Sequence, residues 1–293
     1  MIYVRDIRQE TDSLAPEFPA AGIFIMKQVQ ALRQEEGLMM MAERQIKILN
    51  MIQEDGSVQV EELAKELDVS PMTIRRDLEK LQKEGLIERC HGGAVSKTEV
   101  AYADKSVKNH GEKERIAEKS VEFIREGTTV YLDAGTTTYE IAKRIMDMEN
   151  MTVITNDLEI ALLMKNSKAE LILCGGYVQK STGSTLGYYT TQMIADFRFD
   201  TGFFGAAAIS GEFHVLTPTM DKAFLKRQLV KQCRQSFLTV DDSKFNRQGM
   251  NRINCLADYT GIITDHEFKE PEKAVLRKQG VRIISVNQEI SRD

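Results

Sequence analysis

The chain has 293 residues, of which 42% are hydrophobic and 28% are charged. This composition is typical of globular proteins and excludes a disordered or fibrous chain, and the length fits about two domains. The longest early apolar run, residues 20–26, is far shorter than the roughly 20 residues that cross a bilayer. The four cysteines are widely spaced and form no C-x-x-C pair, and the four histidines are scattered. We therefore predict a cytoplasmic protein with reduced cysteines, no membrane segment, no metal site and no cofactor.

The net charge of −5 does not by itself point to a nucleic-acid partner. Residues 42–95 carry 8 basic and 11 acidic side chains, and residues 96–293 carry 27 of each. Any binding of DNA must therefore come from a local basic surface and not from the overall charge.

The first 41 residues show no long amphipathic pattern, and Met39, Met40 and Met41 stand directly before a strong helical pattern. A purine-rich stretch of the gene that resembles a bacterial ribosome-binding site would encode residues such as 34–37 (Q-E-E-G). We predict that translation starts at one of these methionines and that residues 1–41 are an overextended leader. The alternative is a weakly ordered N-terminal arm.

Residues 42–95 predict three helices and a hairpin. Apolar side chains at 46, 49 and 52 recur at helical spacing until Asp55-Gly56 ends the pattern, and residues 60–67 predict a second short helix. After a tight turn, Ser70 is a good N-cap and Pro71 suits the first position of a third helix, which extends to about residue 84. Residues 86–95 are typical of a small hairpin. This order predicts an α+β winged helix-turn-helix domain.

The third predicted helix carries a basic face. Its apolar residues share one side by helical spacing, and Arg75, Arg76 and Lys80 lie toward the other. Such a helix fits the major groove of DNA, where arginine and lysine reach guanine edges or phosphates. Thr73 and the helix N-terminus capped by Ser70 can bind a phosphate. The alternative is a solvated helix face, which is the usual fate of a run of charges.

The second part of the chain follows a polar segment, residues 96–112, which we interpret as a linker. Short apolar strands then alternate with helical patterns, which predicts an α/β domain over residues 113–293 with a mostly parallel sheet. The expected strands are 128–132, 152–155, 171–174, 201–205, 237–240, 261–264 and 282–286, and the expected helices are 139–148, 158–165, 220–234 and 271–279.

The first strand–helix junction of this domain is typical of an anion site. It contains Asp133, Gly135, Thr136, Thr137 and Thr138. Backbone N–H groups, hydroxyls and the helix dipole would point at one phosphate there. The chain has neither G-x-x-x-x-G-K-[ST] nor G-x-G-x-x-G, which argues against ATP, GTP and dinucleotides. The alternative is a helix N-cap with spare threonines.

Polar or glycine residues also follow three other predicted strands. Thr155 and Asn156 follow one, Gly175 and Gly176 follow another and permit close approach to the backbone, and Lys244 lies shortly after a third. Ligands of open α/β sheets bind outside the carboxyl ends of the strands. We therefore expect these residues near the same site, with Lys244 supplying the positive charge that a phosphate needs. The alternative for Lys244 is a surface lysine paired with a neighbouring aspartate.

The N-terminal domain contains V-E-E-L-A-K-E-L-D-V-S, T-I-R-R-D-L and R-C-H-G-G-A in one collinear run. These strings resemble the N-terminal domain of DeoR-family bacterial transcriptional regulators. The resemblance implies that Thr73, Arg75 and Arg76 lie in the DNA groove and that Arg89 and His91 belong to the wing, close to the DNA backbone or minor groove. From the residues alone, His91 beside two glycines could equally be a turn residue.

The C-terminal domain resembles the effector domain of the same family, because D-A-G-T-T-T, T-N-D-L, the glycine pair, F-F-G-A and D-S-K-F occur in the family's order. The resemblance implies a fold like that of ribose-phosphate isomerase and a phosphorylated sugar or related metabolite as effector. It implies that Asp133 and the three threonines hold ligand hydroxyls and phosphate, and that Lys244 holds the charged end. Residues 206–209 read A-A-A-I, where regulators often have a polar residue and the isomerases an acidic pair.

The missing carboxylate in this segment removes the obvious general base and favours a sensor over an enzyme. We therefore predict a DNA-binding transcriptional regulator without catalytic residues, a repressor of carbohydrate-metabolism genes that a phosphorylated sugar releases from double-stranded operator DNA. One small winged domain offers limited contacts, so we expect a homodimer or homotetramer on a repeated or palindromic site. The alternative is a sugar-phosphate isomerase-like enzyme with a DNA-binding appendage.

Overall fold

A computed structural model of the protein describes residues 43–90 and 92–287. The predicted leader, residues 1–41, and His91 lie outside the described residues. Within the described ranges, no helix is both long enough and apolar enough to cross a membrane.

The N-terminal part contains three helices and a three-stranded antiparallel sheet in the order β1-β3-β2. The elements are α3 (Glu43–Asp55), β1 (Ser57–Gln59), α4 (Val60–Glu66), α5 (Pro71–Lys83), β2 (Ile87–Cys90) and β3 (Gly93–Ser96). Apolar side chains of all three helices, such as Ile48, Leu63 and Leu78, are fully buried. The predicted winged helix-turn-helix fold is confirmed, and β1 is an additional strand that was not predicted.

The C-terminal part contains a seven-stranded sheet in which all neighbouring strands are parallel, in the order β15-β14-β12-β9-β4-β5-β6. This confirms the predicted α/β domain. The strands are β4 (Thr129–Leu132), β5 (Thr152–Thr155), β6 (Glu170–Leu173), β9 (Phe199–Phe204), β12 (Cys233–Thr239), β14 (Gly261–Thr264) and β15 (Arg282–Ser285). The main helices are α7 (His110–Val121), α8 (Thr136–Arg144), α9 (Leu158–Met164), α10 (Tyr188–Ala195), α11 (Met220–Gln232) and α12 (Glu270–Lys278).

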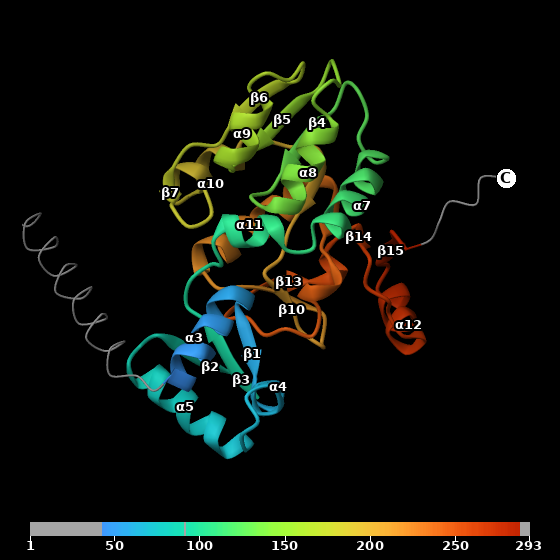
Figure 1. Ribbon diagram of the computed structural model, residues 1–293. Helices are drawn as coiled ribbons and strands as arrows, with labels where there is room; N and C mark the ends of the chain where they lie inside the picture. Colours follow the sequence, from blue (N-terminus) through green and yellow to red (C-terminus); the bar gives the residue numbers. More distant parts are fainter. Residues whose placement is uncertain (1–42, 91, 288–293) are drawn as a thin grey trace, which may run out of the picture. The chain divides into compact units, whose positions relative to one another are not determined.

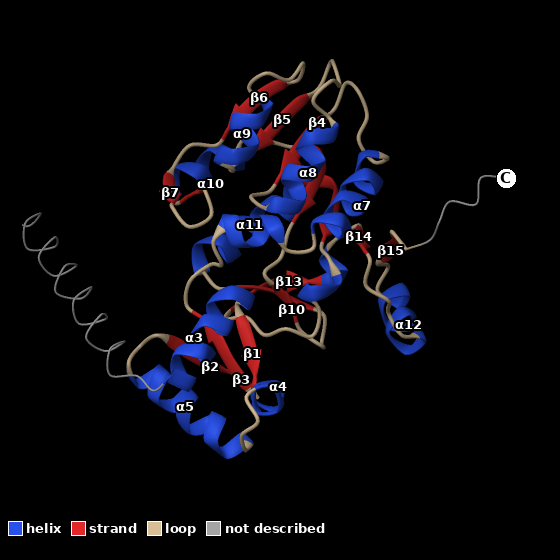
Figure 2. Ribbon diagram, viewed as in Figure 1, coloured by secondary structure: helices blue, strands red, loops and turns tan. Residues whose placement is uncertain are grey.

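Both faces of the seven-stranded sheet are covered, because successive side chains of a strand point to opposite sides. Val130 and Leu132 of β4 pack in one core cluster with α7, α8 and α9, whereas Tyr131 packs in the other with α10 and α11. Figure 1 shows α7 and α8 side by side, and Figure 2 shows α8 beside β4 and α9 beside β6. Strands buried on both faces explain the short, continuous apolar runs of the sequence.

Several features differ from the predicted elements. The helices α7 and α10 were not predicted. The segment 96–112, predicted as a linker, contains the helix α6 (Tyr102–Val107) and the first residues of α7. Helix α8 begins at Thr136 and not at residue 139, so the threonines form its first turn. Two small antiparallel sheets were not predicted, because strands this short give too few alternations to recognise. They consist of β7 (Tyr177–Gln179) and β8 (Ser184–Leu186), and of β10 (Ala208–Ile209), β11 (His214–Thr217) and β13 (Asn251–Cys255).

The strand order places a crevice between β4 and β9. The chain proceeds from β4 through β5 to β6 on one side, and from β9 through β12, β14 and β15 on the other. Loops that leave two adjacent strands in opposite directions open a crevice at the carboxyl ends, where ligands of such sheets bind. The loop that starts at Asp133 and the segment that starts at Gly205 follow these two strands.

Gly93 provides a test of the wing. It lies in β3, the central strand of the small sheet, and a Cβ atom there would lie 2.0 Å from the carbonyl oxygen of Val58. We expect Gly93→Ala to force β1 and β3 apart and to lower the stability of this domain by about 1–3 kcal/mol, as overpacking does. Thermal unfolding followed by circular dichroism measures the effect.

The matched control is Gly111→Ala. Gly111 lies in α7, and no heavy atom lies within 4 Å of the position that its Cβ would take. Alanine is favoured over glycine in a helix, so this variant should be as stable as the wild type or slightly more stable. Equal melting of the Gly93 variant and the control would contradict the described packing of β1 on β3.

Candidate functional site

The first candidate surface is the exposed face of α5. The helix begins at Pro71 because the Oγ of Ser70 accepts a hydrogen bond from the N–H of Thr73 at 3.2 Å and proline occupies the first helical position. The predicted helix start is thus confirmed. Ile74, Leu78 and Leu81 are fully buried and fix the helix on the domain core. The opposite face exposes Met72, Arg75, Arg76, Glu79, Lys80 and Lys83.

The two arginines of this face differ in their partners. Arg75 Nη2 lies 3.3 Å from Glu61 Oε1, and both side chains are largely exposed. Arg76 and Lys80 have no ion-pair partner among the residues that the structure describes. Their charges are therefore available to an external anion, whereas Arg75 must first leave Glu61, at little cost because the pair is solvated.

Arg89 of the wing is held by backbone oxygens. Its Nε donates to the carbonyl of Gly93 at 3.1 Å, and its Nη1 donates to the carbonyl of Arg75 at 3.2 Å. The guanidinium therefore ties β2 to β3 and to α5, and its role in the described structure is to position the wing. His91 is outside the described residues, so its position relative to Arg89 stays a prediction.

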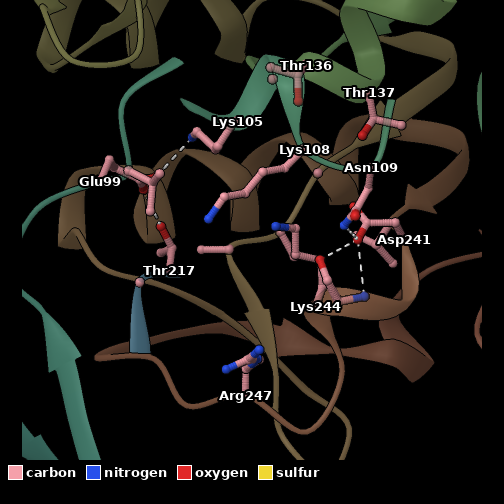
Figure 3. Close-up of a pocket in the computed structure, with 18 of the residues that line it drawn as sticks. Glu99, Lys105, Lys108, Asn109, Thr136, Thr137, Thr217, Asp241, Lys244 and Arg247 are labelled. Carbon is pink, nitrogen blue, oxygen red and sulfur yellow. Dashed lines mark hydrogen bonds and ion pairs between the residues drawn. The ribbon is translucent and has the colours of Figure 1, made fainter. Parts of the chain in front are cut away.

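The second candidate site is a cavity of about 260 Å³ at the crevice after β4 and β9. Thr136 and Thr137 line it from α8, and Ala206 and Ala207 from the segment after β9. Seven basic side chains also line it, and we name it the basic cavity for them: Lys105, Lys108, Lys113, Lys222, Lys226, Lys244 and Arg247. Figure 3 shows Lys105 reaching toward Glu99 on one side and Asn109 and Asp241 on the other.

The first turn of α8 forms one wall of the basic cavity. Among the described residues, no side chain caps this helix end, so the N–H groups of the first turn are left to bind a ligand. Thr138 is occupied, because its Oγ1 donates to the carbonyls of Asp133 and Gly135 at 2.6 and 2.8 Å. Thr136 and Thr137 therefore remain the hydroxyls that this wall offers.

Asp157 fixes the loop before α8. Its Oδ2 accepts from the N–H of Gly135 at 3.0 Å, and its Oδ1 accepts from the N–H groups of Glu159 and Ile160 at 2.8 and 3.1 Å. Burial raises the pKa of Asp157 to about 6, although these three donors oppose the shift. One carboxylate thus aligns the starts of α8 and α9.

Asp133 is buried and already neutralised. Its Oδ2 lies 2.6 Å from Lys226 Nζ and accepts from the N–H of Gly205 at 3.0 Å. Lys226 also donates to the carbonyl of Gly205 at 2.7 Å. Asp133 therefore joins the ends of β4 and β9 to α11, which is a positioning role that its sequence position did not suggest.

Lys244 reaches the basic cavity from a short 3-10 turn, Asp242–Lys244. Asp241 begins this turn, and its buried Oδ1 accepts from Ser243 N at 3.1 Å and from Asn109 Nδ2 at 2.8 Å. The alternative pairing of Lys244 with Asp242 is not found among the described residues, since Asp242 Oδ1 lies 2.6 Å from His266 Nδ1.

Five residues predicted near this site do not line the basic cavity: Asp133, described above, and Thr155, Asn156, Gly175 and Gly176. Thr155 Oγ1 donates to the carbonyl of Leu132, and Asn156 bonds Tyr131 and the carbonyl of Thr185, so both join strands inside the fold. The carbonyl of Gly175 accepts from Thr190, and a Cβ at Gly176 would lie 2.0 Å from Thr190 Oγ1. Gly176 thus accommodates α10 and β8, and at this glycine the close approach is made by the protein itself, whereas no described heavy atom outside its chain neighbours lies within 4 Å of a Cβ placed at Gly175.

Sequence reasoning missed most of the basic residues. Lys222 and Lys226 stand four residues apart on α11, on the same buried side as Leu225 and Leu229. Lysines at helical spacing with core leucines are the signal that could have revealed them, because lysine is almost never buried without a partner. Lys105 and Lys113 lie in or beside the predicted linker and gave no such signal.

The crowded charges alter the acidity of these lysines. Burial lowers the pKa of Lys222 to about 8, with Glu99 opposing the shift and Lys105 and Lys226 adding to it. Burial likewise lowers the pKa of Lys113 to about 8, with Asp241 opposing and Lys244 adding to the shift. Seven basic side chains and four carboxylates line the basic cavity, so a bound anion would compensate part of the remaining positive charge.

Comparisons with known proteins agree with this arrangement. The family model described as the DeoR-like helix-turn-helix domain matches residues 44–100, and that of the DeoR C-terminal sensor domain matches residues 108–266. The chain is 34% identical to a putative aga operon transcriptional repressor of Escherichia coli O157:H7, over 84% of this chain and 94% of that protein. It is also 34% identical to the glycerol-3-phosphate regulon repressor of Escherichia coli K12, over 74% and 88%.

Solved structures give a more distant likeness. Ribose 5-phosphate isomerase A from Methanocaldococcus jannaschii aligns with a TM-score of 0.35 and 16% identity, over 47% of this chain and 55% of that one. The delta subunit of eIF2B from Chaetomium thermophilum aligns with a TM-score of 0.41 and 14% identity, over 55% and 58%. The aligned part spans about half of each neighbour.

The two family models together cover both folded parts of the chain in the order in which the winged helix-turn-helix and the α/β domain occur. The sequence relatives extend over most of their own length. The chain therefore belongs to the DeoR family of DNA-binding transcriptional regulators.

Proposed function

We propose that this regulator represses carbohydrate-metabolism genes in the cytoplasm and that a phosphorylated sugar in the basic cavity releases it from double-stranded operator DNA. The observation that carries the proposal is that seven basic side chains and only four carboxylates line the basic cavity, into which the first turn of α8 opens without a side-chain cap from a described residue. Names of relatives support the metabolic class, since one represses a glycerol-3-phosphate regulon. The proposal follows from charge, because such a cavity binds a compact dianion better than a neutral sugar.

The phosphate is placed at the first turn of α8. The N–H groups of this turn and the hydroxyls of Thr136 and Thr137 supply donors, and the positive end of the helix dipole favours an anion. Lys244 supplies a full charge from the opposite wall. Gly135 and Thr138 also line this wall, Asp133 supports it from outside the cavity lining, and Thr155, Asn156, Gly175 and Gly176 have no part in the proposed site.

The sugar hydroxyls would face the polar groups beyond the phosphate. Asn109 and Asp241 are already hydrogen-bonded to each other on that side, and the Asn109 amide has capacity for a further bond. A sensor is favoured over an isomerase, because Ala206 and Ala207 form the wall beside Gly205 and Asp133 is bound to Lys226. A general base must be free to take a proton, and an ion-paired carboxylate is a poor one.

On the DNA side, α5 is the proposed reader. Arg76 and Lys80 would reach base edges and phosphates in the major groove, with Thr73 and the Ser70-capped helix start on a phosphate. One such helix reads a short half-site, so a homodimer or homotetramer on a repeated site is part of the proposal.

Arg76→Ala tests the reader helix. If Arg76 contacts a guanine with both ends of its guanidinium, its loss should cost about 1–3 kcal/mol of operator affinity and relax specificity at that base pair. Lys168→Ala is the matched control, because Lys168 pairs with Glu149 on the exposed surface of the other domain. Gel-shift titration against operator variants measures both proteins. Operator affinity that survives in an Arg75/Arg76 double alanine variant would exclude α5 as the reader.

Lys244→Met tests the effector site. The variant should keep its operator affinity and lose its response to sugar phosphate, because the charge on the phosphate loses its partner. Calorimetry with ribose 5-phosphate and glycerol 3-phosphate, together with a thermal melt, checks binding and folding. Native-like affinity for a sugar phosphate in the folded variant would remove Lys244 from the site, and turnover of ribose 5-phosphate by the wild type would favour the isomerase instead.

The pH dependence of this binding follows from the two lysines with a pKa of about 8, Lys222 and Lys113. Both pKa values are lowered, so both lysines lose their proton as the pH rises through about 8. The phosphate stays dianionic above its second pKa of about 6. Affinity for the sugar phosphate should fall by up to about tenfold per lysine between about pH 7 and about pH 9. Affinity that stays constant over this range would show that these lysines do not hold the ligand.

A further inference from the structure

Glu99 is a carboxylate that comes from outside the sensor fold and is buried in the basic cavity. It lies between the end of β3 at Ser96 and the start of α6 at Tyr102, and its side chain is only 5% exposed. Its Oε1 accepts from Thr217 Oγ1 at 3.0 Å and lies 3.6 Å from Lys222 Nζ. Its Oε2 lies 3.6 Å from Lys105 Nζ (Figure 3).

The contacts of Glu99 keep it charged. Burial alone would raise its pKa, but Lys222 and Lys105 outweigh burial and hold the pKa at about 2, so the side chain is a carboxylate at neutral pH. Both ion-pair distances of 3.6 Å exceed the roughly 2.7–2.9 Å of a charge-assisted hydrogen bond. Glu99 therefore occupies the place of an anion, and a stronger anion can replace it.

Lys105 connects Glu99 with the place proposed for the phosphate. Burial lowers the pKa of Lys105, Glu99 opposes this, and Lys244 and Lys226 add to the lowering. Lys105 thus lies within electrostatic reach of both Glu99 and Lys244. A dianion beside Lys244 would attract Lys105 and repel the Glu99 carboxylate in the same low-dielectric cavity.

The chain is anchored on both sides of Glu99. Downstream, the N–H of Tyr102 donates to the carbonyl of Ser181 at 2.8 Å, and the Tyr102 ring packs edge-on against Tyr139. Upstream, Glu99 is three positions after Ser96, the last residue of β3, a distance of at most about 11 Å when extended. The two residues between them are tied to the wing sheet, because Lys97 Nζ lies 3.0 Å from Glu88 Oε1 of β2 and the N–H of Thr98 donates to Ser96 Oγ at 3.2 Å. Movement of Glu99 is therefore passed toward β3, the central strand of the wing sheet.

We propose that Glu99 is a built-in competitor of the effector phosphate, which occupies Lys222 and Lys105 in the free protein and is expelled from the basic cavity when the phosphate binds. Expulsion shifts residues 97–101 and with them the end of β3, which couples the cavity to the DNA-binding domain. This inference rests on the proposed function, because it assigns the regulation of that same site. A ligand changes DNA affinity only through its different affinity for two states, and Glu99 inside or outside the cavity defines them.

Glu99→Gln tests the competition. Removing the negative charge should raise the affinity for ribose 5-phosphate, glycerol 3-phosphate or inorganic phosphate, whichever binds the wild type, by a factor in the range of about 5–150. By reciprocity the unliganded variant should bind operator DNA more weakly, and phosphate should change its DNA affinity little. The control is Glu126→Gln, an exposed glutamate after α7, which should behave as the wild type.

Hydrogen exchange of the wild type gives a second measurement that does not depend on a folded variant. Added phosphate should speed exchange of the amides in residues 97–101 and slow exchange in the first turn of α8. Phosphate binding with unchanged exchange at 97–101, or a folded Glu99→Gln protein that binds phosphate no more tightly than the wild type, would overturn this inference alone. Failure of every phosphate compound to bind the wild type would overturn the proposed function as well.

Discussion

The buried ion pair between Lys226 and Asp133 is the contact on which the sensor domain depends. Asp133 ends β4, Lys226 lies in the middle of α11, and both bind Gly205 at the end of β9. The pair therefore fastens the two strands at which the order of the sheet reverses. Removing one member of such a pair leaves an uncompensated buried charge, which typically costs about 3–5 kcal/mol, so neither side chain is free to serve a ligand directly.

This arrangement decides what the basic cavity can do. Because Asp133 neutralises Lys226, the net charge of the cavity comes from the six other basic side chains, and Glu99, Asp241, Glu54 and Asp55 compensate only part of it. Burial of like charges destabilises the free protein, as the lowered pKa of Lys222 and Lys113 indicates. A bound anion reverses that effect, so ligand affinity and the stability of the sensor domain are linked through the same groups.

The DNA-binding part follows a simpler physical rule. Ser70 and Pro71 set the start of α5, the buried face fixes its rotation, and the exposed face is the one that we propose contacts DNA. The wing is held to that helix by Arg89, which bonds two backbone carbonyls. The side chains predicted to contact DNA therefore fall into two groups. Some are exposed charges, such as Arg76, whereas the Arg89 guanidinium holds the wing against α5.

The sequence by itself determined the features that depend on neighbouring residues. Local spacing predicted the cap of α5, the continuous apolar strands of the parallel sheet and the threonine segment after β4. The structure contains all three, with the threonines in the first turn of α8. Only the tertiary structure decided which polar residues meet. Thr155 and Asn156 follow a strand as Asp133 does, yet they bond other strands inside the fold.

The lysines of the basic cavity show the physical reason for this limit. Lys105 comes from the segment predicted as a linker, Lys222 from a helix more than a hundred residues later, and Glu99 joins them from the chain between the two domains. No local pattern records that they share a site, because their charges interact through space. The family motifs predicted the threonine wall of the cavity, which is continuous in sequence. The lysines and Glu99 come from distant segments, and only the folded chain brings their charges together.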